Sequence, residues 1–204
     1  MMRKVPKTIL WGMAPWIMGV LLSSPVAWGG EPTNQLKQSV DRIISILTDP
    51  QYKTPGQKEE RRAAIRRTAD ERFNWEEMSR RSLGPRWREI SEAEKKEFVK
   101  LYSDLLEKNY ISKIEDYSGE KVIYVNDTVD GDYATVQTKI LTKKGTEVPL
   151  NYRLLKENNK WFIYDVVIAG VSLINNYRSQ FNSILLHSSF KDLLEKMKSK
   201  QTTG

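Results

Sequence analysis

Residues 163–181, IYDVVIAGVSLINNYRSQF, decide the fold because they join a buried strand to the helix that follows it. Residues 163–168 are apolar at every position except Asp165, so this strand should be covered on both faces. Ala169 and Gly170 end the strand. The next residues carry an apolar stripe at helical spacing, and Ser172 is placed to cap that helix. The stripe comprises Ile174, Tyr177, Phe181, Ile184 and Leu185.

The opposite face of this helix is polar but almost uncharged. Residues 171–187 contain a single Arg, whereas residues 92–108 of another predicted helix contain nine charged side chains. Amides and hydroxyls can be buried without burying charge. We therefore expect this face, which includes Asn176, Arg178 and Gln180, to lie against backbone or to line the mouth of a polar pocket.

The sequence before this stretch predicts three further strands, at residues 120–125, 133–141 and 147–155. Residues 126–132, 143–145 and 157–159 have the composition of turns, so the four strands should form an antiparallel meander. Alternation gives two of the strands one dry side. On that side lie Ala134, Val136, Thr138, Ile140, Val148, Leu150, Tyr152 and Leu154.

The first half of the chain has the periodicity of helices, at residues 32–47, 57–72, 73–83 and from Ser91 onward. Ser91 and Glu94 form a capping box, and residues 189–200 make a last amphipathic helix. Helices, then a sheet, then helices indicate an α+β fold, with helices on one side of a curved antiparallel sheet of four strands or slightly more. We expect a single domain over residues 30–204, helical over about 32–115, with the sheet at about 120–168 and the C-terminal helices at about 171–200.

Residues 1–29 have the three parts of a secretory signal peptide, with a basic start, an apolar run and small residues before a cleavage site near Gly29. An uncleaved membrane anchor is the alternative, although the apolar run is short for a bilayer span. The chain has no Cys, which excludes lipid attachment and disulfides. Its net charge is +7, and removal of Arg3, Lys4 and Lys7 leaves +4.

Few residues have the pattern of a catalytic site. His187 is the only His, and no Cys nucleophile, Gly-rich phosphate loop or metal-ligand spacing is present. Asp165 is the best acid or base candidate, because it lies in an apolar strand. The alternative is that Asp165 accepts hydrogen bonds from backbone groups or from an Arg. A second hypothesis is an enzyme with a small cavity, like steroid isomerases, that uses Asp165 or Tyr164 as acid or base. This hypothesis rests only on fold analogy.

Residues 61–88 contain nine Arg and four acidic residues, so their net charge of +5 accounts for the net positive charge of the mature chain. This segment is either a solvated helix face or a docking surface for an acidic partner or an anionic membrane. Nucleic acid is disfavoured, because the nearby aromatic residues are explained by core packing and an exported protein rarely meets nucleic acid. An envelope adaptor that docks through this segment without a ligand also fits.

Several spaced motifs occur in order: residues 73–87 (FNWEEMSRRSLGPRW), Phe98 and Leu101, residues 164–166 (YDV), residues 170–173 (GVSL) and residues 176–181 (NYRSQF). Together they resemble the MlaC, or toluene-tolerance, family over most of the mature chain. The resemblance implies a periplasmic phospholipid-binding protein without a cofactor. It also implies that lipid moves between an outer-membrane lipoprotein–porin complex and an inner-membrane ABC transporter with a lipid-binding ring, which maintains outer-membrane lipid asymmetry. Many family members carry an acidic residue before Gly-Val-Ser, whereas this chain has Ala169 at that position. We therefore expect no head-group or partner contact of that acid in this chain.

A one-sided dry sheet roofed by helices can enclose an apolar lipid cavity. We expect the lipid to be lined by residues of the dry face and of the helix stripes. They are Phe73, Met78, Leu101, Leu105, Val136, Ile140, Leu150, Tyr152, Val166, Ile168, Val171, Ile174, Tyr177 and Phe181. The expected docking residues for a transporter or membrane are Arg80, Arg81, Arg86 and Arg88.

Overall fold

The computed structural model describes residues 30–202, so the predicted signal peptide lies outside the described residues. The α-helices are α1 (Glu31–Thr48), α2 (Lys58–Asp70), α3 (Trp75–Leu83), α4 (Glu92–Glu115), α5 (Leu173–Leu185) and α6 (Phe190–Thr202). Short 3-10 helices occupy Pro50–Lys53, Pro55–Gln57 and Gly84–Arg88. The strands are β1 (Lys121–Asp130), β2 (Tyr133–Leu141), β3 (Glu147–Glu157), β4 (Lys160–Ile168) and β5 (Val171–Ser172). The predicted order of helices, sheet and helices is confirmed.

The five strands form one antiparallel sheet in the order β1-β2-β3-β4-β5, as the meander predicted. Asn158 and Asn159 both have positive φ and make the two-residue turn between β3 and β4. The prediction of a turn over residues 126–132 was wrong for most of that range. β1 continues to Asp130 beyond a bulge at Val125, because Asn126–Asp130 pair with β2 residues Tyr133–Gln137.

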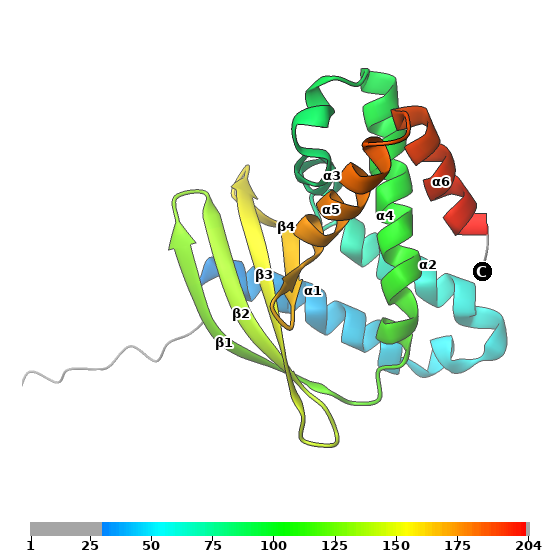
Figure 1. The fold of residues 1–204 in the computed structure, drawn as a ribbon. Coiled ribbons are helices and arrows are strands. Elements are labelled where there is room, and N and C mark those ends of the chain that lie inside the picture. The colour runs from blue at the N-terminus through cyan, green and yellow to red at the C-terminus, as the bar shows by residue number, and fades with distance from the viewer. Residues whose placement is uncertain (1–29, 203–204) are drawn as a thin grey trace, which may run out of the picture.

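Helix α1 packs across one face of the curved sheet, and this face is called the inner face below, while α3 and α5 contact β4 (Figure 1). In Figure 1, α1 runs across the strands, while α3, α4 and α5 gather beside β4 and α6 lies against α4. The inner face carries Val136, Leu154 and Ile163, which are 0%, 0% and 2% exposed and join the helices in one core cluster. Aromatic rings of Phe98, Tyr102 and Phe181 fill the space between α4 and α5.

Side chains at the helix starts satisfy backbone N–H groups that have no partner inside the helix. The Ser91 hydroxyl accepts from the Glu94 amide, and the Glu94 carboxylate accepts from the Ser91 amide, which confirms the predicted capping box. Asn74 caps α3, and Ser172 caps α5 as predicted. These caps fix where α3, α4 and α5 begin, and therefore where their apolar stripes meet the sheet.

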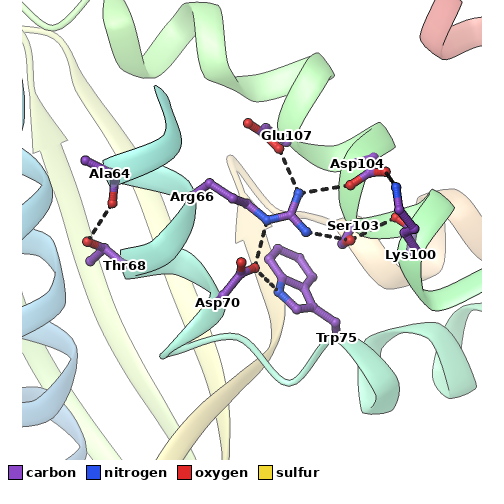
Figure 2. Close-up of polar contacts among 9 residues, drawn as sticks. All are labelled: Ala64, Arg66, Thr68, Asp70, Trp75, Lys100, Ser103, Asp104 and Glu107. Atoms are coloured by element: carbon purple, nitrogen blue, oxygen red, sulfur yellow. Dashed lines mark hydrogen bonds and ion pairs between the residues drawn. The ribbon is translucent and has the colours of Figure 1, made fainter. Parts of the chain in front are cut away.

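Arginines of α2 tie this helix to α4 (Figure 2). The Arg66 guanidinium bonds Asp70 on its own helix, and Ser103, Asp104 and Glu107 on α4, at 2.7–3.1 Å. Its charge also lies over the Trp75 ring, 5.6 Å from the centroid. A second contact between α2 and α4 lies about one helical turn before Arg66, where Arg61 and Arg62 both donate hydrogen bonds to Glu115 at the end of α4. Much of the Arg-rich segment thus stabilises contacts within the helical layer.

Candidate functional site

The junction between β4 and α5 is built around the carboxylate of Asp165, a residue that is buried. One oxygen accepts from the Ser172 hydroxyl at 2.7 Å and from Arg153 at 3.1 Å, and the other accepts from the Ile174 amide at 3.2 Å. Ala169 and Gly170, both at positive φ, make the tight reversal that brings Ser172 back beside the strand. Both oxygens of Asp165 are therefore engaged in holding the start of α5, which supports the structural alternative for this residue.

The inner face of the sheet has two halves with different cover. The half near the β1–β2 and β3–β4 turns is closed over β2 and β3, where Ala134, Val136 and Leu154 are buried, while Val129 on the edge strand β1 is exposed. We call it the closed half. In the other half, nearer the β2–β3 hairpin, the apolar inner-face side chains are only partly buried, although Thr138, which lies among them, is buried. We call this half the open zone; its apolar members are Val122, Tyr124, Ile140, Val148, Leu150, Tyr152 and Ile168.

Strand register makes the open zone a continuous surface. Val122 lies opposite Ile140, and Ile140 opposite Val148, while Leu150 lies opposite Ile168. Tyr124, Leu150, Tyr152 and Ile168 also pack against the core cluster, as does Tyr110 of α4. The open zone is thus a partly exposed apolar surface that borders the buried core. Such a surface can hold an acyl chain without any covalent chemistry.

The polar groups of the open zone are phenols that stay protonated at neutral pH. Burial raises the pKa of Tyr152 to about 12. Burial also raises the pKa of Tyr124, and the fields of Tyr152 and Asp41 add to the effect. The Tyr124 oxygen is buried and has no hydrogen-bond partner. Within the described residues, no cluster of His, Asp or Glu could hold a metal ion.

A second apolar hollow, of about 300 Å³, lies between α4, α5 and α6. Leu105, Tyr177 and Phe181 form part of its wall, and Leu193 and Met197 of α6 complete it. Lys196 and Lys200 stand among its lining residues. Among helices of residues 30–202, none is long and apolar enough to cross a bilayer.

Comparisons with known proteins identify the family of this chain and a solved structure with a similar fold. The family model described as MlaC protein matches residues 37–199. The chain belongs to the MlaC family. A relative in Haemophilus influenzae, the intermembrane phospholipid transport system binding protein MlaC, is 25% identical over 167 residues, which are 79% of this chain and 78% of that protein. The fold of a phospholipid-binding protein from Ralstonia solanacearum, solved in complex with a phospholipid, superposes with a TM-score of 0.74 at 20% identity, covering 83% of this chain and 96% of that one.

The predicted lipid-lining residues of this MlaC-family chain fall into four groups. Ile140, Leu150, Tyr152 and Ile168 lie in the open zone, and Leu105, Tyr177 and Phe181 line the hollow beside α6. Met78, Leu101, Val136, Val166 and Ile174 are buried in the core cluster. Phe73 stacks on Trp75 beside the edge of β4, and Val171 is 57% exposed on β5. All of these residues except Ile140 and Val171 belong to the core cluster or pack against it, so the structure brings most of the set together.

The predicted docking arginines differ in how they are held. Arg80 and Arg81 both donate to Glu77 at 2.6 Å, and the Arg81 charge lies 4.1 Å from the Tyr164 ring centroid. Arg86 pairs with Glu89 on the surface, and Arg88 is exposed. Arg81 is therefore a packing residue, whereas Arg86 and Arg88 remain accessible for docking.

Of the two alternatives for the polar face of α5, burial against backbone was wrong. Asn175, Asn176, Ser179, Gln180, Asn182 and Ser183 are all exposed. Arg178 alone turns toward the protein, and its Nε donates to the Arg81 carbonyl at 2.8 Å. Gln180 also lines the hollow beside α6.

Sequence reasoning missed Val122, Tyr124 and Val148 as members of the candidate site. All three could have been found from alternation, because Val122 and Tyr124 alternate with polar or exposed neighbours on β1 just as Ile140 does on β2. Val148 was recognised as part of the dry face, but it was not included among the lipid-lining residues.

Proposed function

We propose that this protein is a periplasmic phospholipid carrier. It would shuttle lipid between an outer-membrane lipoprotein–porin complex and an inner-membrane ABC transporter with a lipid-binding ring, and so help to maintain outer-membrane lipid asymmetry. The observation that carries the proposal is the continuous, partly exposed apolar surface of the open zone in a chain of the MlaC family. The names of the two relatives, which both refer to phospholipid, support the choice of ligand.

The energy of such binding follows from the acyl chains. Each buried methylene contributes about 0.8 kcal/mol, so one long chain supplies on the order of 10 kcal/mol before the costs of association are subtracted. This is enough to hold a lipid in water without a cofactor. The same magnitude makes spontaneous release slow, so transfer to a membrane needs a partner or an opening motion.

The lipid-lining residues that we propose are those of the open zone together with the adjoining core residues. The core is included because a chain that enters the open zone next meets Val136, Val166 and the stripes of α4 and α5. The hollow beside α6 shares Leu105, Tyr177 and Phe181 with that core. We do not include Val171, because its side chain projects from the exposed β5.

The proposal is tested by native mass spectrometry of protein purified from cells, comparing the wild type with Leu150→Glu. A carboxylate in the middle of the open zone should remove copurified diacyl phospholipid, because burying an unpaired charge against an acyl chain is strongly unfavourable. Gln137→Glu is the matched control, since Gln137 is exposed on the neighbouring strand. A wild-type protein that carries no lipid and takes none from vesicles would instead favour an envelope adaptor. A folded Leu150→Glu protein that retains lipid would contradict the assigned site.

A further inference from the structure

The hydroxyl of Tyr124 is one of four buried side-chain polar atoms of the described residues that have no hydrogen-bond partner, with Arg61 Nε, Ser79 Oγ and Trp161 Nε1. Of these four, only Tyr124 lies in the open zone. It lies on the inner face of β1, its oxygen is buried, and it has no hydrogen-bond partner. Thr138 faces it across the strand pair, but no hydrogen bond joins the two hydroxyls, and the Thr138 hydroxyl donates to the Leu150 carbonyl instead. A buried hydroxyl without a partner costs about 1–3 kcal/mol, so its retention calls for a partner that the chain itself does not supply.

The position of this hydroxyl limits what the partner can be. Tyr124 belongs to the open zone, whose other members are aliphatic side chains and Tyr152. The carboxylate of Asp41 on α1 is close enough for its negative field to act on the phenol. Lys37, on the same helix, is already paired with Asp41 at 2.5 Å. The Asp41 carboxylate would repel an anionic phosphate at this position, whereas a neutral oxygen acceptor has no net charge to be repelled.

We propose that the Tyr124 hydroxyl donates a hydrogen bond to an ester carbonyl oxygen of a bound diacyl lipid. This inference rests on the proposed function. The ester group stands between the acyl chains and the phosphate, so this bond fixes how deeply the lipid enters. The chains then lie on Ile140, Leu150 and Ile168, and the charged head group stays outside the apolar zone. The site selects ester-linked over ether-linked lipids, because an alkyl ether offers no carbonyl oxygen.

The experiment compares two phospholipids that have the same head group and chain length, one with two ester links and one with two alkyl ether links. Dissociation constants are measured for the wild type, Tyr124→Phe and Tyr133→Phe. Tyr133 is the matched control, because the same atom is removed from an exposed ring that packs against Tyr164. A net hydrogen bond is worth about two- to tenfold in affinity, so the wild type should prefer the diester by this factor.

Tyr124→Phe should bind both lipids with equal affinity, at the level of the wild type with the diether, while Tyr133→Phe keeps the diester preference. Without lipid, Tyr124→Phe should melt no lower than the wild type, because the substitution removes an unpaired buried oxygen. A diester preference that survives in Tyr124→Phe, or no preference in the wild type, overturns this inference alone. If the wild type binds neither lipid, the proposed function fails instead.

Discussion

Asp165→Ala is the substitution that tests most directly how the strand and helix at residues 163–181 are held together. The carboxylate is 2% exposed and receives three hydrogen bonds, two of them from the Ser172 hydroxyl and the Ile174 amide. Both donors lie in buried residues, at 8% and 3% exposure. Alanine leaves them without an acceptor, and each unpaired donor costs about 1–3 kcal/mol. The third donor, Arg153, is 44% exposed, so water can replace its partner at little cost.

Two buried donors alone would therefore cost about 2–6 kcal/mol, but removal of a buried carboxylate also removes its desolvation penalty. We accordingly expect Asp165→Ala to lower the free energy of unfolding by about 2–4 kcal/mol, a large share of the 5–15 kcal/mol typical of a domain. Asp165→Asn, which keeps one carbonyl oxygen as an acceptor, should lose less. The measurement is urea unfolding of the mature chain followed by circular dichroism.

The control for this experiment is Asp130→Ala, because Asp130 is exposed at the end of β1. Its free energy of unfolding should stay within about 0.5 kcal/mol of the wild type. If Asp165→Ala were equally mild, the carboxylate would not be the group that positions α5, and the reasoning from its three hydrogen bonds would be refuted.

Two further predictions concern charged groups. Hydrogen bonds from Arg62, opposed by burial and reinforced by Arg61, lower the pKa of Glu115 from 4.5 to about 2. The stabilisation from Glu115 is therefore complete above about pH 4.5 and is lost as the pH falls toward 2. The difference in unfolding free energy between the wild type and Glu115→Gln should shrink over that interval. A difference that stays constant with pH would contradict this prediction. Arg88→Glu should slow lipid transfer to anionic vesicles more at low than at moderate salt, because Arg88 is exposed. Lys144→Glu, a matched change in the β2–β3 hairpin, should have a smaller effect, and equal rates for both variants would argue against docking through Arg88.

Local physics made much of the fold predictable. Ser91 and Glu94 identify a helix start because both capping partners are within four residues, and Asn158 and Asn159 identify a turn because Asn tolerates positive φ. The length of β1 was not predictable in the same way. Asn126 and Asp127 are poor strand formers, and they are extended because Gln137 and Val136 of β2 pair with them. That pairing is a tertiary contact across a bulge, which no local pattern reports.

The candidate site was predictable to a similar degree. Alternation identified the dry face of β2 and β3, but it could not show that Val136 is closed and Ile140 is partly open. That difference depends on where the helices cross the sheet, and contacts of this kind join residues far apart in sequence. The exposed polar face of α5 is the converse case. The lack of charge on this face was interpreted as a sign of burial, yet Asn175 and Asn176 are exposed. Their amide groups form hydrogen bonds with water without carrying a charge.

The distribution of polar contacts supports the proposal that a lipid enters at the open zone. Near the closed half, Thr33 of α1 donates to Asp127 at 2.8 Å, and Gln35 of α1 accepts from the Trp161 amide at 2.9 Å. Arg72 adds a bond to the Trp161 carbonyl at 2.7 Å. A ligand entering there would have to break hydrogen bonds and leave their groups unpaired. At the open zone, the contacts with the core are between apolar side chains such as Leu150 and Ile168. An acyl chain replaces such contacts with others of the same kind, so the exchange costs least where the sheet is already partly uncovered.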